Sequence, residues 1–477
     1  MNGTLGLAIA FFGCLLVVLL IGLSSSRLAQ DSAADYFVAS RSMPPWLVGL
    51  SAVATNNSGY MFIGLIGYTY TVGLQSIWLM VGWITGDLIA SLIAHERLRD
   101  EAHAQDAKGI ISVLTRWGGQ NRRAWQVVAS VVSVLFLSVY SASQIAAGGK
   151  PLQGLLDIPS VYGMVMVAAV VLAYSIAGGI RASIWTDAAQ SVLMVISMLF
   201  LLVAAVEHLG GLGPVIDQAQ AIDGFMSLSP TGLDVPGWYG IVAFIVGWMF
   251  AGSAALGQPH IVSRFLALKE TRQMNRVRML YYAYYILFNS FATCVGLLSR
   301  LYFTRGADFD AEMALPDMAR DLLPGWLAGL MLAGIFSATM STADSLVLSC
   351  SSALTQDLPK KPIETKGLIK LATTFTTVLA LVIAVSSNQS VFSLVVWAWG
   401  TLGAAFAPVM MMQIMGRRLS AIQMLVVSVF GVLATVVWKF QGYPGSFYEG
   451  AFGMVVGLST GLVLSGFSRQ NHLNGGG

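Results

Sequence analysis

The sequence has little charge, few cysteines and none of the common catalytic motifs. Only 10% of its 477 residues are charged, and a net charge of +3 is too small to argue for a nucleic-acid partner. The three cysteines lie in apolar segments and are expected to be small core residues, and the five histidines have no metal-ligand spacing. No P-loop, G-x-S-x-G or H-E-x-x-H motif occurs. These absences argue against an enzyme and against ATP-driven transport.

Apolar residues dominate instead. They make up 56% of the chain, and the mean hydropathy is +0.73. The composition predicts an all-α polytopic membrane protein. About thirteen apolar runs are long enough to cross a bilayer. They lie at about 5–25, 44–71, 74–96, 125–148, 158–178, 184–206, 237–256, 277–302, 322–353, 367–387, 389–415, 420–438 and 445–467.

Basic residues predict the orientation of these segments. With the N-terminus outside, all but five of the 26 Lys and Arg residues fall on the cytoplasmic side. The exceptions are Lys150, Arg300, Arg305, Arg320 and Lys439. The positive-inside rule therefore predicts an inner-membrane protein with its N-terminus outside and its C-terminus in the cytoplasm. The first run lacks a basic start, so we expect a retained helix and not a cleaved signal.

The order of the segments indicates an internal repeat. We expect an additional helix in 1–43, five helices in 44–206, an extracellular loop at 207–236, five more helices in 237–415 and two C-terminal helices in 416–477. Because five is odd, the second set of five must run inverted relative to the first. The loops are too short to form a soluble domain.

The first helix of each set contains a polar or Gly/Pro-rich interruption. In the first set it is S-A-V-A-T-N-N-S-G (Ser51–Gly59), and in the second it includes Gly252, Gly257 and Pro259. Interruptions at matching places in two halves predict a binding site near the middle of the membrane, built from unwound helix. A simple kink in each helix is the alternative.

A third segment is unusually rich in hydroxyl groups. Between 332 and 353, the residues Ala338, Ser341, Thr342 and Ser345 share one helical face, and Asp344 follows beside them. Hydroxyl oxygens near a carboxylate suit a small hard cation such as Na+. The same hydroxyls could instead bond to carbonyls of their own helix or to a neighbouring helix.

Six stretches of the chain, in order, resemble the sodium:solute symporter family, and most closely its bacterial sodium/proline symporter branch. They are D-Y-F-V-A-S-R-S-M (Asp35–Met43), S-A-V-A-T-N-N-S-G, S-V-Y-S-A-S-Q-I-A-A-G (Ser138–Gly148), G-G-I-R-A-S-I-W-T-D-A-A-Q (Gly178–Gln190), G-Q-P-H-I-V-S-R-F (Gly257–Phe265) and A-T-M-S-T (Ala338–Thr342). The resemblance implies an inverted five-plus-five core of the LeuT type with flanking helices.

The resemblance also implies ion sites. The ligands of a principal Na+ would be the backbone carbonyls of Ala54, Asn57 and Ala338 and the hydroxyls of Ser341 and Thr342. Some relatives hold a second Na+ beside an aspartate, which here corresponds to Asp187, with Asp344 and Ser345 as further candidates. Na+ is thus the expected coupling ion, with one or two bound.

A substrate site is expected beside the first interruption. The candidates are Asn56, Ser58, Gly59, Tyr140, Gln144, Ala255, Gln258 and Pro259. Tyr140 and Gln144, one turn apart, could equally be ordinary contacts between helices. Asp87 is expected to be satisfied by a neighbour and not to be a ligand.

Two positions depart from the proline branch. Asn56 stands where that branch has an aspartate, and we hypothesise that Asp344 supplies part of the missing charge. Ala251 and Ala255 stand where the branch has aromatic residues, which opens the pocket.

These features predict a Na+-coupled symporter that imports an amino acid such as proline, or a similar zwitterion or carboxylate. A sugar, sialic acid or another organic acid is the alternative solute. A membrane sensor that acts with a separate signalling partner is the alternative of another class.

Overall fold

The computed structural model describes residues 3–30, 32–230, 233, 235, 237–303, 309–387, 391–441 and 447–474. This part of the chain is helical, with one isolated backbone bridge between Met43 and Leu268 as its only extended pairing. The helices are α1 (Gly3–Ser25), α2 (Ala33–Val38), α3 (Pro45–Gly59), α4 (Ile66–Val72), α5 (Ile77–Ala104), α6 (Ile110–Arg116), α7 (Arg123–Leu156), α8 (Ser160–His208), α9 (Leu212–Gln220), α10 (Gly237–Ser253), α11 (Pro259–Leu266), α12 (Met274–Tyr302), α13 (Ala314–Leu322), α14 (Gly325–Ser352), α15 (Lys366–Ser386), α16 (Val391–Ile414), α17 (Ala421–Phe440) and α18 (Glu449–Asn474).

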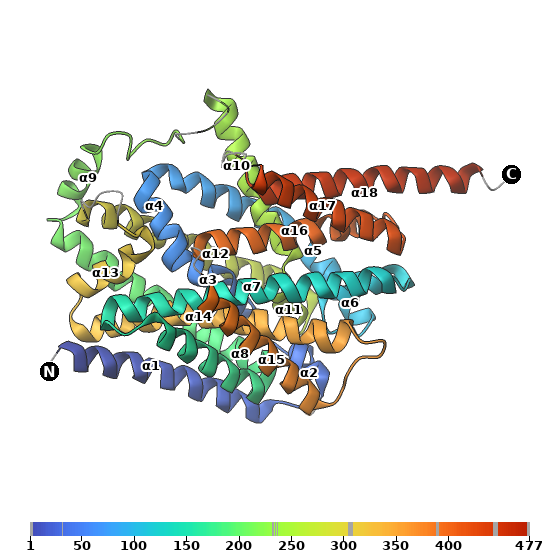
Figure 1. Cartoon of the computed structure of the whole chain (residues 1–477), viewed down its shortest axis with the longest axis horizontal. Helices are drawn as coiled ribbons and strands as arrows, with labels where there is room; N and C mark the ends of the chain where they lie inside the picture. The colour runs from blue at the N-terminus through green and yellow to red at the C-terminus, as the bar shows by residue number, and fades with distance from the viewer. Residues whose placement is uncertain are drawn as a thin grey trace.

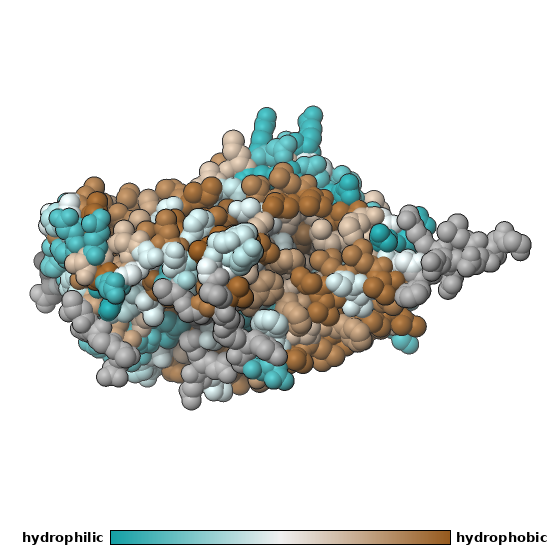
Figure 2. Space-filling model, turned by 90° about the horizontal axis from the view of Figure 1, so that it is seen from above, coloured by the Kyte–Doolittle hydropathy of each residue, from teal (hydrophilic) through white to brown (hydrophobic). Residues whose placement is uncertain are grey.

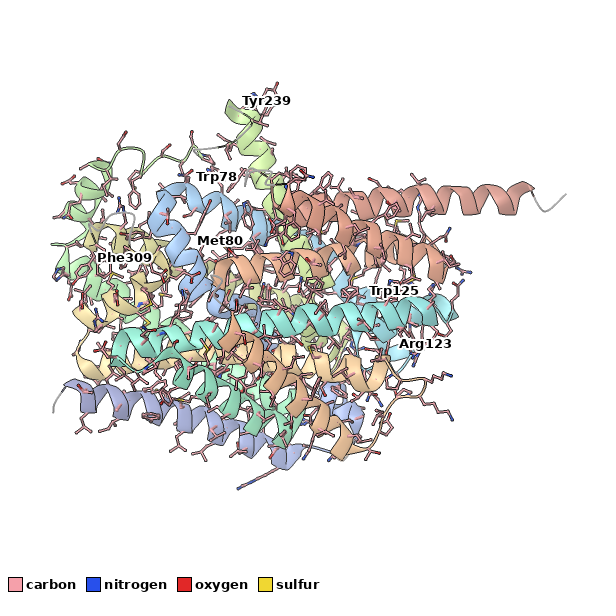
Figure 3. All side chains as sticks on the ribbon, in the orientation of Figure 1. Trp78, Met80, Arg123, Trp125, Tyr239 and Phe309 are labelled. Atoms are coloured by element: carbon pink, nitrogen blue, oxygen red, sulfur yellow. The ribbon has the colours of Figure 1, made fainter. Side chains whose placement is uncertain are left out.

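The long helices run side by side along one direction of the molecule (Figure 1). Helix α1 begins at one end of the bundle and α18 finishes at the other, an arrangement that an odd number of crossings produces (Figure 1). In Figure 3, Arg123 at the start of α7 lies towards the C-terminal end, and Phe309 lies at the opposite end.

The surface of the bundle is that of a membrane protein. Large apolar side chains are exposed along α1, α15 and α17, for example Leu16, Phe375 and Phe430. Figure 2 shows a broad hydrophobic surface, with hydrophilic groups gathered towards its margins. Helices that are apolar on all sides are stable only in a protein core or in lipid. The chain is therefore a multi-pass membrane protein.

The number of crossings stays a prediction. The described residues form eleven helical segments long and apolar enough to span a membrane, and this count does not confirm the expected thirteen. Two of the eleven, 45–104 and 160–208, contain 60 and 49 residues, whereas a single crossing needs about 20.

Both long segments are interrupted by glycines with positive φ. Gly73 has φ +77°, and Gly179, inside α8, has φ +55°. A Cβ at Gly179 would lie 2.5 Å from the Tyr36 carbonyl oxygen, and one at Gly73 would lie 2.2 Å from that of Phe225. Only glycine tolerates both this conformation and this close approach of backbone.

Two expected boundaries can be compared with the structure. The loop expected at 207–236 lies between α8 and α10 and contains the short helix α9. The run predicted from 322 is helical from Gly325, after Pro324 at the N-cap. Arg305 and the predicted starts of helices at 389 and 445 lie outside the described residues.

Helix α14 is one of the two most enclosed of the long helices, together with α16. Its side chains from Met331 to Ser352 are buried without interruption. It packs against α1, α3, α7 and α8. This position explains its composition, because small and hydroxyl-bearing residues let neighbouring backbones approach closely.

Candidate functional site

The first interruption lies at Ser58, at the end of α3. Its backbone has φ 29° and ψ 175°, outside the helical region, and a π-helical segment (Tyr60–Leu65) follows. The Tyr60 N–H donates to the carbonyl of Asn57 and to Ser58 Oγ, the latter at 3.1 Å. The regular pattern of helical backbone hydrogen bonds is thereby broken. Backbone groups at the break can therefore bind other partners.

The second interruption separates α10 from α11. A 3-10 turn (Ala254–Gly257) follows α10, and Gln258 is extended, with φ −99° and ψ 100°. Pro259 then begins α11, where its missing N–H costs nothing. The structure thus confirms the two interrupted helices that the sequence predicts.

Helix α14 presents its hydroxyl face to the first interruption. Ser341 Oγ donates to the carbonyl oxygens of Ala54 and Ala338, at 3.1 Å each. Thr342 Oγ1 donates to the carbonyl of Thr55 at 2.8 Å and, more weakly, to that of Ala338 at 3.3 Å. All of these groups are fully buried. Four of the five predicted Na+ ligands therefore converge.

The donor set fits Na+. It consists of uncharged carbonyl and hydroxyl oxygens, the ligands that hard cations prefer. The fifth predicted ligand, Asn57, lies at the same break, and its buried side-chain amide has no partner among the described residues. Sequence reasoning missed the carbonyl of Thr55, because which backbone oxygens face α14 depends on where the helix unwinds.

The residues proposed for a second cation also come together, but around an arginine. Arg264 Nη2 lies 3.3 Å from Asp187 Oδ2 and 3.5 Å from Asp344 Oδ1. The same nitrogen donates to the hydroxyls of Ser183 and Ser345. The cluster holds two acidic side chains and one basic one, each with no exposed surface.

Several atoms of this cluster lack a partner among the described residues. They are Asp187 Oδ1, Asp344 Oδ2, Arg264 Nε and Arg264 Nη1. Sequence reasoning missed Arg264, although it lies in the quoted G-Q-P-H-I-V-S-R-F stretch. It lies five residues after Pro259, and the predicted orientation placed it on the cytoplasmic side.

The substrate candidates lie around both interruptions. Asn56 Nδ2 donates to the Tyr281 hydroxyl at 2.5 Å, and the Gly59 N–H donates to Gln144 Oε1 at 2.7 Å. Gln258 Nε2 donates to the Trp399 carbonyl at 3.0 Å. Ala255 and Pro259 are buried at the second break.

Aromatic rings enclose this region. The Tyr140 ring lies 5.4 Å from His260 and 6.4 Å from Trp399. Trp399 is in turn 5.1 Å from Trp83, and its Nε1 donates to the Ala251 carbonyl at 2.7 Å. Trp399 is therefore an interior residue and not an anchor at the membrane surface.

Buried polar atoms without partners gather near these rings. Among the described residues they include Asn56 Oδ1, Gln258 Oε1, Trp83 Nε1, the Tyr285 hydroxyl and both ring nitrogens of His260. Buried polar groups are normally hydrogen-bonded, so this concentration points to a ligand or ordered water. Sequence reasoning missed Trp83, His260 and Tyr285, since each belongs to an ordinary helical pattern.

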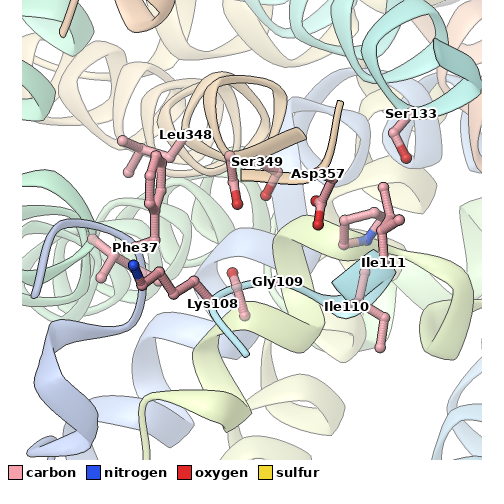
Figure 4. A pocket seen from close by; sticks show the side chains of 13 residues that line it. Phe37, Lys108, Gly109, Ile110, Ile111, Ser133, Leu348, Ser349 and Asp357 are labelled. Carbon is pink, nitrogen blue, oxygen red and sulfur yellow. The ribbon is translucent and has the colours of Figure 1, made fainter. Parts of the chain in front are cut away.

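Cavities lie towards both ends of the bundle. A cavity of about 570 Å³ lies at the end where α1 begins, and its lining includes Tyr68, Lys150 and Asp310. Towards the other end lie one cavity of about 200 Å³, lined in part by Asp106 and Arg116, and a smaller one of about 20 Å³. Figure 4 shows the side chains around the smaller one. It is lined by Phe37, Lys108, Gly109, Ile110, Ile111, Ser133, Ile180, Pro259, Ser263, Leu348, Ser349, Ser352 and Asp357. The smaller volume has room for about one water molecule.

Comparison with known proteins gives a consistent result. A family model described as "Sodium:solute symporter family" matches residues 36–431. The sodium/proline symporter of Escherichia coli is 30% identical over 465 residues, covering 94% of this chain and 90% of that protein. The high-affinity proline transporter of Bacillus subtilis is 28% identical over 458 residues and covers 94% of each chain.

Two solved structures have a similar fold. A Na+-coupled sialic acid symporter, in a substrate-bound outward-open state, superposes with a TM-score of 0.81 at 18% identity and covers 97% of both chains. MhsT in complex with L-phenylalanine superposes with a TM-score of 0.55 at 12% identity, covering 88% of this chain and 98% of the other. The LeuT-type architecture expected from the sequence is confirmed.

Proposed function

The chain belongs to the sodium:solute symporter family, and from this premise we propose that it imports an amino acid such as proline, or a similar small zwitterion, together with Na+. It is a Na+-coupled solute symporter and not an enzyme. The observation that carries the proposal is the meeting of the Ser341 and Thr342 hydroxyls with the carbonyls at the break in α3.

The proposed Na+ ligands are Ala54, Asn57, Ala338, Ser341 and Thr342. In the structure the two hydroxyls donate to carbonyl oxygens. To bind Na+ they would rotate, so that their lone pairs and the carbonyl oxygens all face the ion. Na+ would thus tie α3 to α14 and fix the geometry of the interrupted segment. The affinity of the solute site beside it would then depend on Na+.

The proposed solute site consists of Asn56, Ser58, Gly59, Tyr140, Gln144, Ala255, Gln258 and Pro259. The unpartnered oxygens of Asn56 and Gln258 support this assignment. An amide oxygen can accept from an ammonium group, and N–H groups at a helix break can hold a carboxylate. The names of the relatives from Escherichia coli and Bacillus subtilis favour proline.

A second Na+ at Asp187, Asp344 and Ser345 is proposed with one condition. All three side chains contact Arg264, so the guanidinium group must move before an ion can take its place. With Arg264 where it is, one Na+ per transport cycle is the simpler stoichiometry.

A thermal-stability screen of the purified protein tests the proposal. L-proline, other amino acids, glucose, sialic acid and small carboxylates are each added in NaCl and again in KCl. A ligand that binds only the folded state raises the unfolding temperature, so Na+ alone should stabilise the protein and L-proline should stabilise it further only in Na+.

Na+ should no longer raise the unfolding temperature of the double variant Ser341→Ala/Thr342→Ala. Thr377→Ala is the matched control, since this buried α15 hydroxyl also bonds to a backbone carbonyl but lies away from the break. If Na+ stabilises both variants equally, the assigned ion site is wrong. If a sugar and no amino acid stabilises the protein in Na+, the solute class is wrong.

Uptake into proteoliposomes separates a transporter from a sensor. A Na+ gradient should drive accumulation of the solute that the screen identifies. A solute that binds but does not accumulate in the proteoliposomes would favour the alternative function of a membrane sensor.

A further inference from the structure

Asp87 is a buried carboxylate without a cationic partner. It lies on α5 and is only 2% exposed. Among the described residues it forms no ion pair, and its Oδ2 accepts from the Tyr281 hydroxyl at 2.8 Å. An ionised carboxylate inside a membrane is costly unless a positive charge or a proton compensates it.

Asp87 is connected to both interrupted helices. The Tyr281 hydroxyl that donates to Asp87 also accepts from Asn56 Nδ2, so one oxygen bridges Asp87 and the first break. On the other side, a Cβ at Gly252 of α10 would lie 2.8 Å from the Asp87 backbone nitrogen. Helix α10, which precedes the second break, thus packs directly against the turn of α5 that contains Asp87.

The groups that face Asp87 supply no positive charge. From α12 they are the hydroxyls of Tyr281 and Tyr282, with Tyr285 nearby, and from α3 the amide of Asn56. Arg278 of α12 is held by Glu96 and Ser91, and Arg264 of α11 by the Asp187 cluster. His95, two turns further along α5, contacts Ser91.

Polar side chains follow Asp87 along α5 and α12 towards one end of the bundle. Tyr282 follows Tyr281 on α12, and Ser91 lies one helical turn after Asp87 on α5. Ser91 contacts Arg278, which pairs at 2.7 Å with the half-exposed Glu96. Glu96 lies at the end that the distribution of basic residues predicts to be cytoplasmic.

We propose that Asp87 is a proton site, and that Na+ and the proton alternate as the positive charge that compensates it. When Na+ binds at the first break, the Asp87 carboxylic acid loses its proton, which leaves as H+ by way of Tyr282 and Ser91. When Na+ is released, the carboxylate takes a proton back from water at the same end. The carrier then returns without an uncompensated buried charge. Because the proton leaves and re-enters at the same end, no net proton crosses the membrane.

Tyr281 communicates the change to the solute site. While Asp87 is ionised, the Tyr281 hydroxyl donates to it and accepts from Asn56. Once protonated, Asp87 can donate to the Tyr281 oxygen. The Tyr281 proton is then free to turn to Asn56 Oδ1, which has no partner among the described residues.

This geometry also revises our hypothesis about Asn56. Asp344 bonds to Ser183 and Ser345 and lies beside Arg264, whereas Asp87 is joined to Asn56 through one hydroxyl. Asp87 is therefore the better placed source of the charge that Asn56 lacks.

Proton release on Na+ binding tests the proposal without any solute. Purified protein in weakly buffered detergent solution, with a pH-sensitive dye, receives a pulse of NaCl or KCl. NaCl should release up to one proton per chain and KCl none. Asp87→Asn should abolish the release but keep its stabilisation by Na+. Asp100→Asn, at the exposed end of the same helix, should release protons as the unchanged protein does.

A second measurement covers the case in which Asp87→Asn fails to fold. The infrared difference spectrum of the unchanged protein, NaCl minus KCl, should show loss of the carbonyl band of a protonated carboxylic acid. An unchanged band overturns the proposal.

The outcomes separate this inference from the proposed function on which its Na+ step rests. Stabilisation by Na+ without proton release leaves the symporter assignment standing and overturns the role of Asp87. If Na+ neither stabilises the protein nor releases protons, both are wrong.

Discussion

Arg264 Nη2 lies 3.3 Å from Asp187 Oδ2, and neither side chain has any exposed surface. The pair joins α11, directly after the second interruption, to α8. Because Asp344 of α14 contacts the same nitrogen, three helices of the transport core meet at one buried charge cluster.

The hydroxyls of Ser341 and Thr342 are expected to set the affinity for Na+. Replacing either one with alanine removes one oxygen ligand, worth about 1–1.5 kcal/mol, which corresponds to roughly a tenfold weaker affinity. Thr342→Ser keeps the oxygen and should stay close to the unchanged protein. Titrating the unfolding temperature with NaCl measures the change, and equal Na+ affinities for Thr342→Ala and Thr342→Ser would contradict the prediction.

Arg264→Gln is expected to destabilise the protein by about 3–5 kcal/mol, because it leaves two buried carboxylates without a cation. Adding Asp187→Asn should recover part of this loss, since it removes one of the two charges. Chemical unfolding in KCl measures both effects. If Na+ can replace the guanidinium group, NaCl should stabilise Arg264→Gln more than it stabilises the unchanged protein.

Gly179→Ala is expected to destabilise α8 by about 1–3 kcal/mol, because the new Cβ would stand 2.5 Å from the Tyr36 carbonyl at positive φ. Gly13→Ala, in the middle of α1 with nothing within 4 Å of the added Cβ, is the matched control. It should be neutral or slightly stabilising, since alanine is the better helix former. Equal unfolding temperatures for the two variants would show that the break in α8 does not need glycine.

The predicted orientation is tested by labelling cysteines in intact cells. In a background without the native cysteines, a membrane-impermeant maleimide should label Gly213→Cys, which lies in the segment expected outside. It should not label Gly118→Cys, expected in the cytoplasm. Both positions have open space around the new side chain. The reverse pattern would invert the topology.

The sequence by itself determined the architecture. Long apolar runs must form helices in a bilayer, because no water is present to satisfy their backbone groups. Glycine, proline and clustered polar residues marked both interruptions, and the helical period placed Ser341 and Thr342 on one face. These are local properties, because each depends only on residues that are close together in the sequence.

The partners of the buried charges were decided only by the tertiary structure. Asp87, Tyr281 and Asn56 come from three helices and are separated by up to 225 positions. Arg264 reaches Asp187 and Asp344 across 77 and 80 positions. No spacing rule connects such residues, because which helices become neighbours depends on packing across the whole bundle. In a medium that cannot solvate a charge, that packing also decides whether a buried carboxylate meets an arginine or, like Asp87, only hydroxyl groups.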